Sequence, residues 1–319
     1  MFRTLLLVLS LCISPAFADP FKIVVPSEND SYNLNARILG KYIVKYLPEK
    51  PTLAIQVVPG ASSLVAANYL YNLAPRDGTV IGTLKKDIAL VGVLGGDNIK
   101  FDPLKFSWIG SNLDGRKDAI IVWTNSDRPH IFGSENYPGI NLTYLVKDLA
   151  RLDSKVVVGY ADTGTARLAL ERKEVDGEIY NLSGIKLQKP NWLDKDSEIK
   201  AWLQFGNGPN RHPEYKDVQT LYDMLQSEDQ KEILSTVEAS LSILRPFLAP
   251  PDVPYDRLKI LREAFNNAVK DPEYLEEARN LKLDVSLMDY NEVENLVRKQ
   301  TNISPTMIER LKKYDETKQ

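Results

Sequence analysis

The chain has 319 residues, of which 43% are hydrophobic and 26% charged, and its formal net charge is −3. This is the composition of a globular protein long enough for two domains, and it excludes a disordered or fibrous chain. The one cysteine, Cys12, lies in an N-terminal leader, so the rest of the chain has no thiol for a disulfide or a metal site. Only two histidines and no basic stripe are present, and we therefore expect no metal, no cofactor and no nucleic-acid partner.

The N-terminus reads as a secretory signal peptide from Met1 to Ala18. It has one positive charge at Arg3, a short apolar core, and a small-residue cleavage site that ends at Ala18. The apolar core is too short to span a membrane, and no later stretch approaches the roughly 20 apolar residues required. We therefore expect an exported protein, cleaved after Ala18.

A polar turn separates the first predicted strand, Phe21 to Val25, from a helix predicted from about Leu34 to Tyr46. The turn lacks glycine, so side chains rather than backbone would contact a ligand there. The candidate contacts are Ser27, Asn29 and Ser31. In the alternative interpretation, Ser31 or Asn33 is simply the helix N-cap.

A βαβ unit follows between Ile55 and Leu84. A β-branched run ends at Val58, a Pro-Gly turn opens an Ala-rich helix that ends at Pro75, and residues 79–82 form the returning strand. The first N–H groups of such a helix have no intrahelical partner and favour a carboxylate or phosphate. The candidate contacts in this unit are Gly60, Ala61, Ser62, Ser63 and, at the end of the returning strand, Lys85. The alternatives are a helix merely capped by serine and a solvated lysine.

The second half of the chain repeats this design. After strands at 106–111 and 119–123, a small polar turn at 133–136 precedes a helix through Leu142 and Leu149. A strand at 155–160 is followed by a hydroxyl-rich turn and a helix at 166–173. The candidate contacts in these two turns are Gly133, Ser134, Asp162, Thr163, Gly164 and Thr165.

The remaining pattern predicts two strands, a mostly helical stretch and a return to the first domain. The expected elements are strands at 175–180 and 198–205, helical structure at 221–244, a proline-rich strand at 244–254, helices at 255–270 and 272–281, a strand near 283–286, and a last helix from about Asn291 capped by Asp289 or Asn291. The chain would cross between domains at 125–129 and again at 244–254. We therefore expect domain 1 at 19–125, domain 2 at 126–245, and a return segment of domain 1 with the C-terminal helix at 246–319.

These motifs together resemble a known family. They are VVPGASSLVAANYLYNLAPRDGTVIGTL at 57–84, FSWIGS at 106–111, GY followed by LALERKEVDG within 159–177, and RPFLAPPDVP at 245–254. The chain resembles the extracytoplasmic solute-binding proteins of tripartite tricarboxylate transporters, the Bug family, over nearly its whole length. The resemblance implies an α/β, two-domain periplasmic-binding-protein-like fold of type II, with a mixed sheet flanked by helices in each domain and a ligand cleft between them. It also implies a periplasmic location, a small organic acid as ligand, and the transporter's membrane permease subunits as partners.

The chain departs from the family pattern at two turns. The first turn lacks the family's glycines and places Asn33 near the usual aspartate, while Ala161 and Asp162 stand where closer relatives carry proline and glycine. Glu28 or Asp162 would repel a carboxylate or select an amine or a cation. The identity of the ligand is therefore open at the level of the sequence.

Three functions are compatible with an exported protein of this kind. A non-enzymatic binding protein, expected to be monomeric, fits the two sets of turns that converge on a cleft. A sensing module that binds the same ligand and signals to a membrane kinase would share that cleft. An exported hydrolase is disfavoured because the chain has no Gly-x-Ser-x-Gly elbow, no His-Glu-x-x-His and no cysteine nucleophile.

Overall fold

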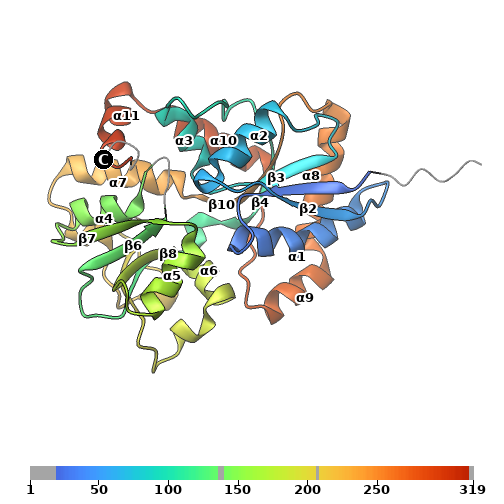
Figure 1. Ribbon diagram of the computed structural model, residues 1–319. Helices are drawn as coiled ribbons and strands as arrows, with labels where there is room; N and C mark the ends of the chain where they lie inside the picture. Colours follow the sequence, from blue (N-terminus) through green and yellow to red (C-terminus); the bar gives the residue numbers. More distant parts are fainter. Residues whose placement is uncertain (1–18, 136–139, 206–207, 316–319) are drawn as a thin grey trace, which may run out of the picture.

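Two β-sheets, each covered by helices, form the body of the protein in a computed structural model (Figure 1). The structure describes residues 19–135, 140–205 and 208–315, so the predicted signal peptide and its cleavage site lie outside it. The two-domain type II α/β fold expected from the sequence is confirmed.

The first sheet has six strands in the order β11-β4-β10-β3-β1-β2. β1 pairs in parallel with both β2 and β3, whereas β10 runs antiparallel to β3 and β4. The strands are β1 Phe21–Val25, β2 Leu53–Val57, β3 Val80–Thr83, β4 Ser107–Asp114, β10 Ile243–Ala249 and β11 Met288–Asp289. The associated helices are α1 Ser31–Tyr46, α2 Leu64–Asn72, α3 Ile88–Leu94, α8 Tyr255–Lys270, α9 Pro272–Asn280 and α10 Tyr290–Thr301.

The alternation of apolar residues along β1 explains why both faces of this sheet are covered. Phe21, Ile23 and Val25 pack into a core with α1 and α8, while Val24 packs with α2 and α3 on the other face. Successive side chains of a strand point to opposite faces, so a continuous apolar strand requires helices on both sides.

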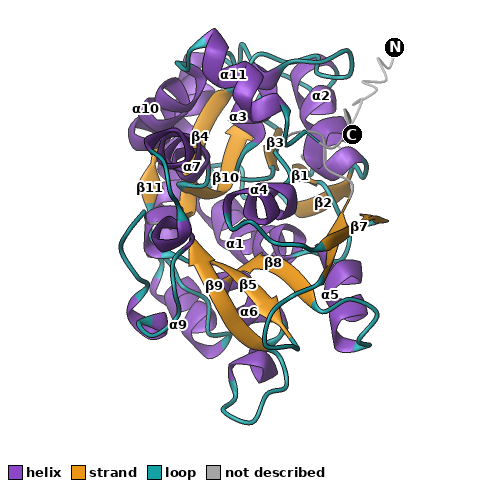
Figure 2. Cartoon of the chain, turned by 90° about the vertical axis from the view of Figure 1, so that its left-hand side faces the viewer, coloured by secondary structure: helices purple, strands orange, loops and turns teal. Residues whose placement is uncertain are grey.

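The second sheet has five strands in the order β7-β6-β8-β5-β9 (Figure 2). Its strands are β5 Ile120–Thr124, β6 Ile131–Glu135, β7 Lys155–Tyr160, β8 Gly177–Asn181 and β9 Lys200–Phe205. The helices that pack in its two cores or follow its strands are α4 Leu142–Leu149, α5 Thr163–Glu171, α6 Leu182–Gln188, α7 Glu228–Ser240 and α11 Pro305–Lys312.

Most predicted elements are present, and the exceptions have identifiable causes. The stretch at 133–135 is part of strand β6 and not a turn, because pairing of Gly133 and Glu135 with β7 overrides the turn preference of Gly133 and Ser134. Asn136 lies outside the described residues. The strand expected near 283–286 is instead the short β11, and helices α3, α6 and α11 were not predicted. The strand expected at 119–123 exists as β5, but it belongs to the second sheet rather than the first.

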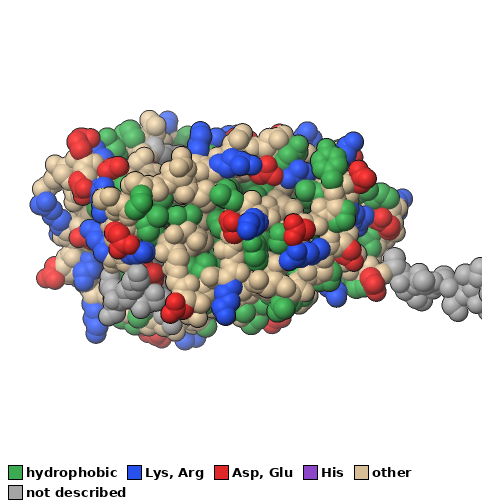
Figure 3. Space-filling model, turned by 90° about the horizontal axis from the view of Figure 1, so that it is seen from above, with side chains coloured by type: hydrophobic (Ala, Val, Ile, Leu, Met, Phe, Trp, Pro, Cys, Tyr) green, Lys and Arg blue, Asp and Glu red, His purple; other side chains and the backbone are tan. Residues whose placement is uncertain are grey.

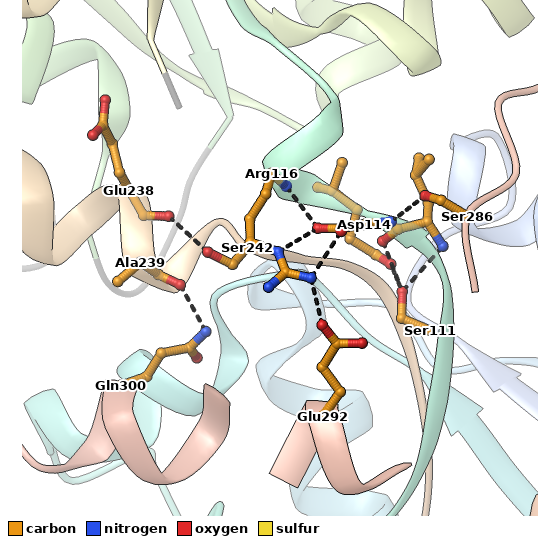
Figure 4. A network of polar contacts seen from close by, with 11 residues as sticks. Ser111, Asp114, Arg116, Glu238, Ala239, Ser242, Ser286, Glu292 and Gln300 are labelled. Atoms are coloured by element: carbon orange, nitrogen blue, oxygen red, sulfur yellow. Dashed lines mark hydrogen bonds and ion pairs between the residues drawn. The ribbon is translucent and has the colours of Figure 1, made fainter. Parts of the chain in front are cut away.

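The chain passes between the sheets at a closely packed junction (Figure 4). The turn after β4 meets the segment before β10, where the backbone N–H of Gly115 donates to the carbonyl of Ser242 at 2.9 Å. The Arg116 guanidinium bonds the Asp114 carboxylate through Nε and Nη2, each at 2.8 Å, and also pairs with Glu292 of α10. The first change of sheet thus falls between β4 and β5, and the domain boundaries expected at 125 and 245 stay a prediction.

The surface carries charges of both signs. In the described part of the face shown in Figure 3, Lys and Arg side chains alternate with Asp and Glu side chains. Among the described residues, no helix is long and apolar enough to cross a membrane.

Candidate functional site

Two connected hollows lie between the sheets, and residues from both sheets line each of them. The outer hollow has a volume of about 580 Å³ and is lined by mostly exposed turns after β1, β2 and β7. The inner cavity has a volume of about 100 Å³ and is lined by mostly buried residues at the ends of β3, β6 and β8 and at the start of α4. Lys85 and Glu135 line both spaces.

An ion pair between Lys85 and Glu135 joins the two sheets across the cleft. The Nζ atom of Lys85 lies 2.5 Å from Oε1 of Glu135, and the side chains are 13% and 15% exposed. Burial acts to lower the pKa of Lys85, but the charges of Glu135, Tyr32 and Asp30 outweigh it and raise the pKa. The lysine therefore stays charged, and its main partner belongs to the opposite sheet.

In the turn after β1, an aspartate of the turn itself caps the helix that follows. Asp30 is the N-cap of α1 and accepts a hydrogen bond from the backbone N–H of Asn33 at 2.9 Å. Burial raises the pKa of Asp30, although Lys85 acts in the opposite direction. The predicted caps Ser31 and Asn33 are wrong; the hydroxyl of Ser31 instead lies 3.1 Å from the hydroxyl of Tyr180, on the other sheet.

In the turn after β7, an aspartate caps the following helix in the same way. Asp162 is the N-cap of α5 and accepts hydrogen bonds from the N–H and the hydroxyl of Thr165 at 2.8 and 2.9 Å. The hydroxyl of Ser27 donates to the other Asp162 oxygen at 3.5 Å across the cleft. At both helix N-termini, an aspartate of the chain occupies a position where a bound anion would otherwise accept hydrogen bonds.

The turn after β2 is open to the outer hollow at Gly60 and Ala61, whose φ angles are 126° and 42°. Ser63 lies apart from the hollow, because its side chain is fully buried and its hydroxyl accepts a hydrogen bond from the backbone N–H of Lys85 at 3.0 Å. The side chain of Ser62 lies outside the described part of the structure.

The cleft thus brings together most of the predicted contacts, but in two separate groups. Those that line the outer hollow are Ser27, Asn29, Gly60, Ala61, Lys85 and Asp162. Those that line the inner cavity are Lys85, Gly133, Ser134 and Thr163. Those that line neither are Ser31, Ser63, Gly164 and Thr165.

Several residues of the inner cavity were not predicted from the sequence. Glu178 on β8 is 2% exposed, its Oε2 has no hydrogen-bond partner, and burial raises the pKa of its carboxyl to about 7. Burial lowers the pKa of Lys86 to about 8. Tyr32 and Tyr180 complete the polar lining.

Metal binding is not indicated by the described side chains. Within residues 19–135, 140–205 and 208–315, no group of three or more His, Cys, Asp or Glu residues is placed to hold a metal ion.

The fold and the cleft define a two-domain periplasmic-binding-protein-like protein of type II. No family model and no curated protein matches the chain. Solved structures do match: the chain is similar to MatC (Rpa3494) from Rhodopseudomonas palustris, solved with bound malate, with 16% identity and a TM-score of 0.67 over 93% of this chain and 99% of that one.

Two further solved structures show the same likeness. The periplasmic binding protein BugD has 16% identity and a TM-score of 0.69, with 92% of this chain and 97% of that chain covered. Rpa4515 from R. palustris, solved with adipate, has 16% identity and a TM-score of 0.66, with 93% and 97% covered. At this identity the likeness establishes the fold. For the fold, it confirms the resemblance noted in the sequence.

Proposed function

We propose that this protein is a non-enzymatic solute-binding protein that captures a small, carboxylate-bearing metabolite between its two sheets. The observation that carries the proposal is the cleft itself, in which Lys85 of one sheet meets Glu135 of the other between turns contributed by both. The malate and adipate bound to MatC and Rpa4515 support a carboxylate as the ligand class.

Lys85 is the group that would anchor the acid. It lies where the inner and outer spaces meet, it is largely buried, and its charge is maintained by its surroundings. A solute carboxylate would take the place of the Glu135 carboxylate on Lys85, since both present the same oxygen acceptors to the same ammonium group.

A thermal-shift screen of the purified protein tests this proposal. The solutes are dicarboxylates, tricarboxylates, amino acids and aromatic acids, and a bound solute at a hundredfold excess over its dissociation constant stabilises the folded state by about 2.7 kcal/mol. Lys85→Met should abolish the shift, whereas Lys270→Met, at an exposed lysine on α8, should preserve it. The proposal fails if no solute shifts the unfolding temperature, or if both variants respond alike.

We further propose that the protein works in the periplasm, after cleavage of residues 1–18, and delivers its solute to the permease subunits of a tripartite tricarboxylate-type transporter. The naming of BugD as a periplasmic binding protein supports this location. Cell fractionation tests the location, and affinity capture in the presence of the solute tests the partner. Recovery of a membrane kinase instead of a permease would favour a sensing role.

A further inference from the structure

The cleft is rich in negative charge, which is unfavourable for a ligand that carries only carboxylates. The ionisable side chains that line the two spaces are Glu28, Asp30, Lys85, Lys86, Asp87, Glu135, Asp162 and Glu178. With all of them ionised, six acids face two lysines, and the net formal charge is −4. Another cation, the buried guanidinium of Arg167, lies against the Tyr180 ring at 4.2 Å and reduces this excess without reversing it.

The two helix N-termini do not correct this imbalance. Asp30 and Asp162 occupy the N-caps of α1 and α5 and accept hydrogen bonds from first-turn N–H groups. A solute carboxylate placed there would meet a like charge, which costs free energy in a partly buried site. In a dicarboxylate or tricarboxylate, each carboxylate that is not neutralised by Lys85 or Lys86 would be repelled by these acids.

Glu178 is an acceptor without a donor. Its carboxylate lines the inner cavity, is 2% exposed, and has an oxygen that no described group contacts by a hydrogen bond. Leaving a buried charged group unpaired is costly, and such groups in folded proteins are normally satisfied by a partner, a water molecule or a ligand. An ammonium group carries three donors, any of which could satisfy this oxygen.

Lys86 provides the opposite charge in the same cavity. The charges of Asp87, Asp118 and Glu135 act on its ammonium group, and the cavity wall that it shares with Glu178 also carries the polar side chains of Ser134, Thr163 and Asn181. A buried carboxylate and a buried ammonium group in one small cavity are complementary to a molecule that carries one charge of each sign.

We propose that the inner cavity holds the charged head of a small zwitterionic amino acid, with Glu178 accepting hydrogen bonds from its ammonium group and with Lys85 and Lys86, which both line the cavity, facing its carboxylate. At about 100 Å³ the cavity is smaller than the roughly 300–1,000 Å³ typical of larger ligands, so it suits a head group of a few atoms. The outer hollow of about 580 Å³ is open to a longer side chain. This inference rests on the proposed function, because an amino acid is one class of carboxylate-bearing solute.

Calorimetric titration with matched sets of solutes tests the inference. Each set contains a natural amino acid, the carboxylic acid that lacks its amino group, and the amine that lacks its carboxylate. We expect at least one amino acid to bind about tenfold or more tightly than both truncated analogues, because each truncation removes a hydrogen-bonded charge pair.

Glu178→Gln identifies the group that recognises the ammonium. This variant keeps the shape of the side chain and removes its charge, so it should weaken the amino acid about tenfold or more while leaving the deaminated acid unchanged or more tightly bound. Glu276→Gln, at an exposed acid on α9, is the matched control and should alter neither affinity. The unfolding temperature of each unliganded variant verifies that it is folded.

The possible outcomes separate this inference from the proposed function. If a deaminated acid, a dicarboxylate or a tricarboxylate binds as tightly as every amino acid, the inference of a zwitterionic ligand is refuted. The proposed solute-binding function then still stands. If the preference for the amino acid survives Glu178→Gln, the role of Glu178 is refuted. If no solute of any class binds, the proposed function fails as well.

Discussion

Glu178 should destabilise the unliganded protein in a way that depends on pH. Burial raises the pKa of its carboxyl from 4.5 to about 7, although the nearby Arg167, Lys85 and Lys86 act in the opposite direction. The folded state therefore holds a proton on Glu178 more tightly than the unfolded state does. Between about pH 4.5 and about pH 7, the unfolded chain has lost this proton while the folded protein still holds it, so the free energy of unfolding decreases as pH rises, relative to a variant without the charge.

The size of the effect follows from the shift. A change of one pKa unit corresponds to about 1.4 kcal/mol, so the shift at Glu178 corresponds to about 3 kcal/mol when the carboxyl is fully ionised in both states. Because the side chain is only 2% exposed, solvent screening reduces this figure little. Part of this effect is already present at pH 5, so the variant Glu178→Gln should gain stability over the native protein by about 2–3 kcal/mol more at about pH 8 than at about pH 5.

Urea denaturation of both proteins at these two pH values measures the difference. Any effect of the new amide on packing is the same at both pH values and cancels from the comparison. Glu276→Gln, at an exposed acid on α9, is the matched control for the loss of one carboxylate. A stability difference between Glu178→Gln and the native protein that does not change with pH would mean that Glu178 is not desolvated in the folded state, and the argument from its burial would fail.

Three further changes test other parts of the structure by urea denaturation. Asp162→Ala should lower the free energy of unfolding by about 1 kcal/mol because it removes a helix N-cap, whereas Asp162→Asn should largely retain it, and equal losses would contradict the capping role. Gly115→Ala should cost about 1–3 kcal/mol, because its Cβ would overlap the backbone carbonyl of Leu241, and an unchanged stability would show that the junction is loosely packed. A double-mutant cycle with Lys85→Met and Glu135→Gln should give a coupling energy of about 1 kcal/mol or more, and additive effects would argue against the ion pair.

Local sequence signals were sufficient where tertiary contacts agreed with them. β1 and α8 occur at the residues predicted, since the β-branched run at Phe21–Val25 and the periodic apolar face of Tyr255–Lys270 each suit one environment in the fold. The prediction for the stretch beginning at Gly133 was wrong because its small polar residues were interpreted as a turn, whereas pairing with β7 holds them extended.

The site was predicted less completely because its chemistry depends on how the two sheets meet. Polar residues in the turns could be recognised one turn at a time, and Ser27, Lys85 and Asp162 indeed line the cleft. The burial of Glu178 and the pairing of Lys85 with Glu135 arise from strands far apart in the sequence, and no local pattern reports them. Sequence reasoning also considered Ser31 and Asn33 as caps, although Asp30, one residue before the helix, is equally suited to that role.

The ion pair across the cleft limits what a solute can add to the contacts between the sheets. The Lys85 to Glu135 contact joins the two sheets. A solute that binds Lys85 replaces this contact rather than adding to it, and a ligand shifts a conformational equilibrium only by its difference in affinity for the two states. A carboxylate alone offers Lys85 little more than Glu135 does. A solute that also supplies a donor to Glu178 forms a contact that no described residue makes to its Oε2, and this added contact would strengthen binding.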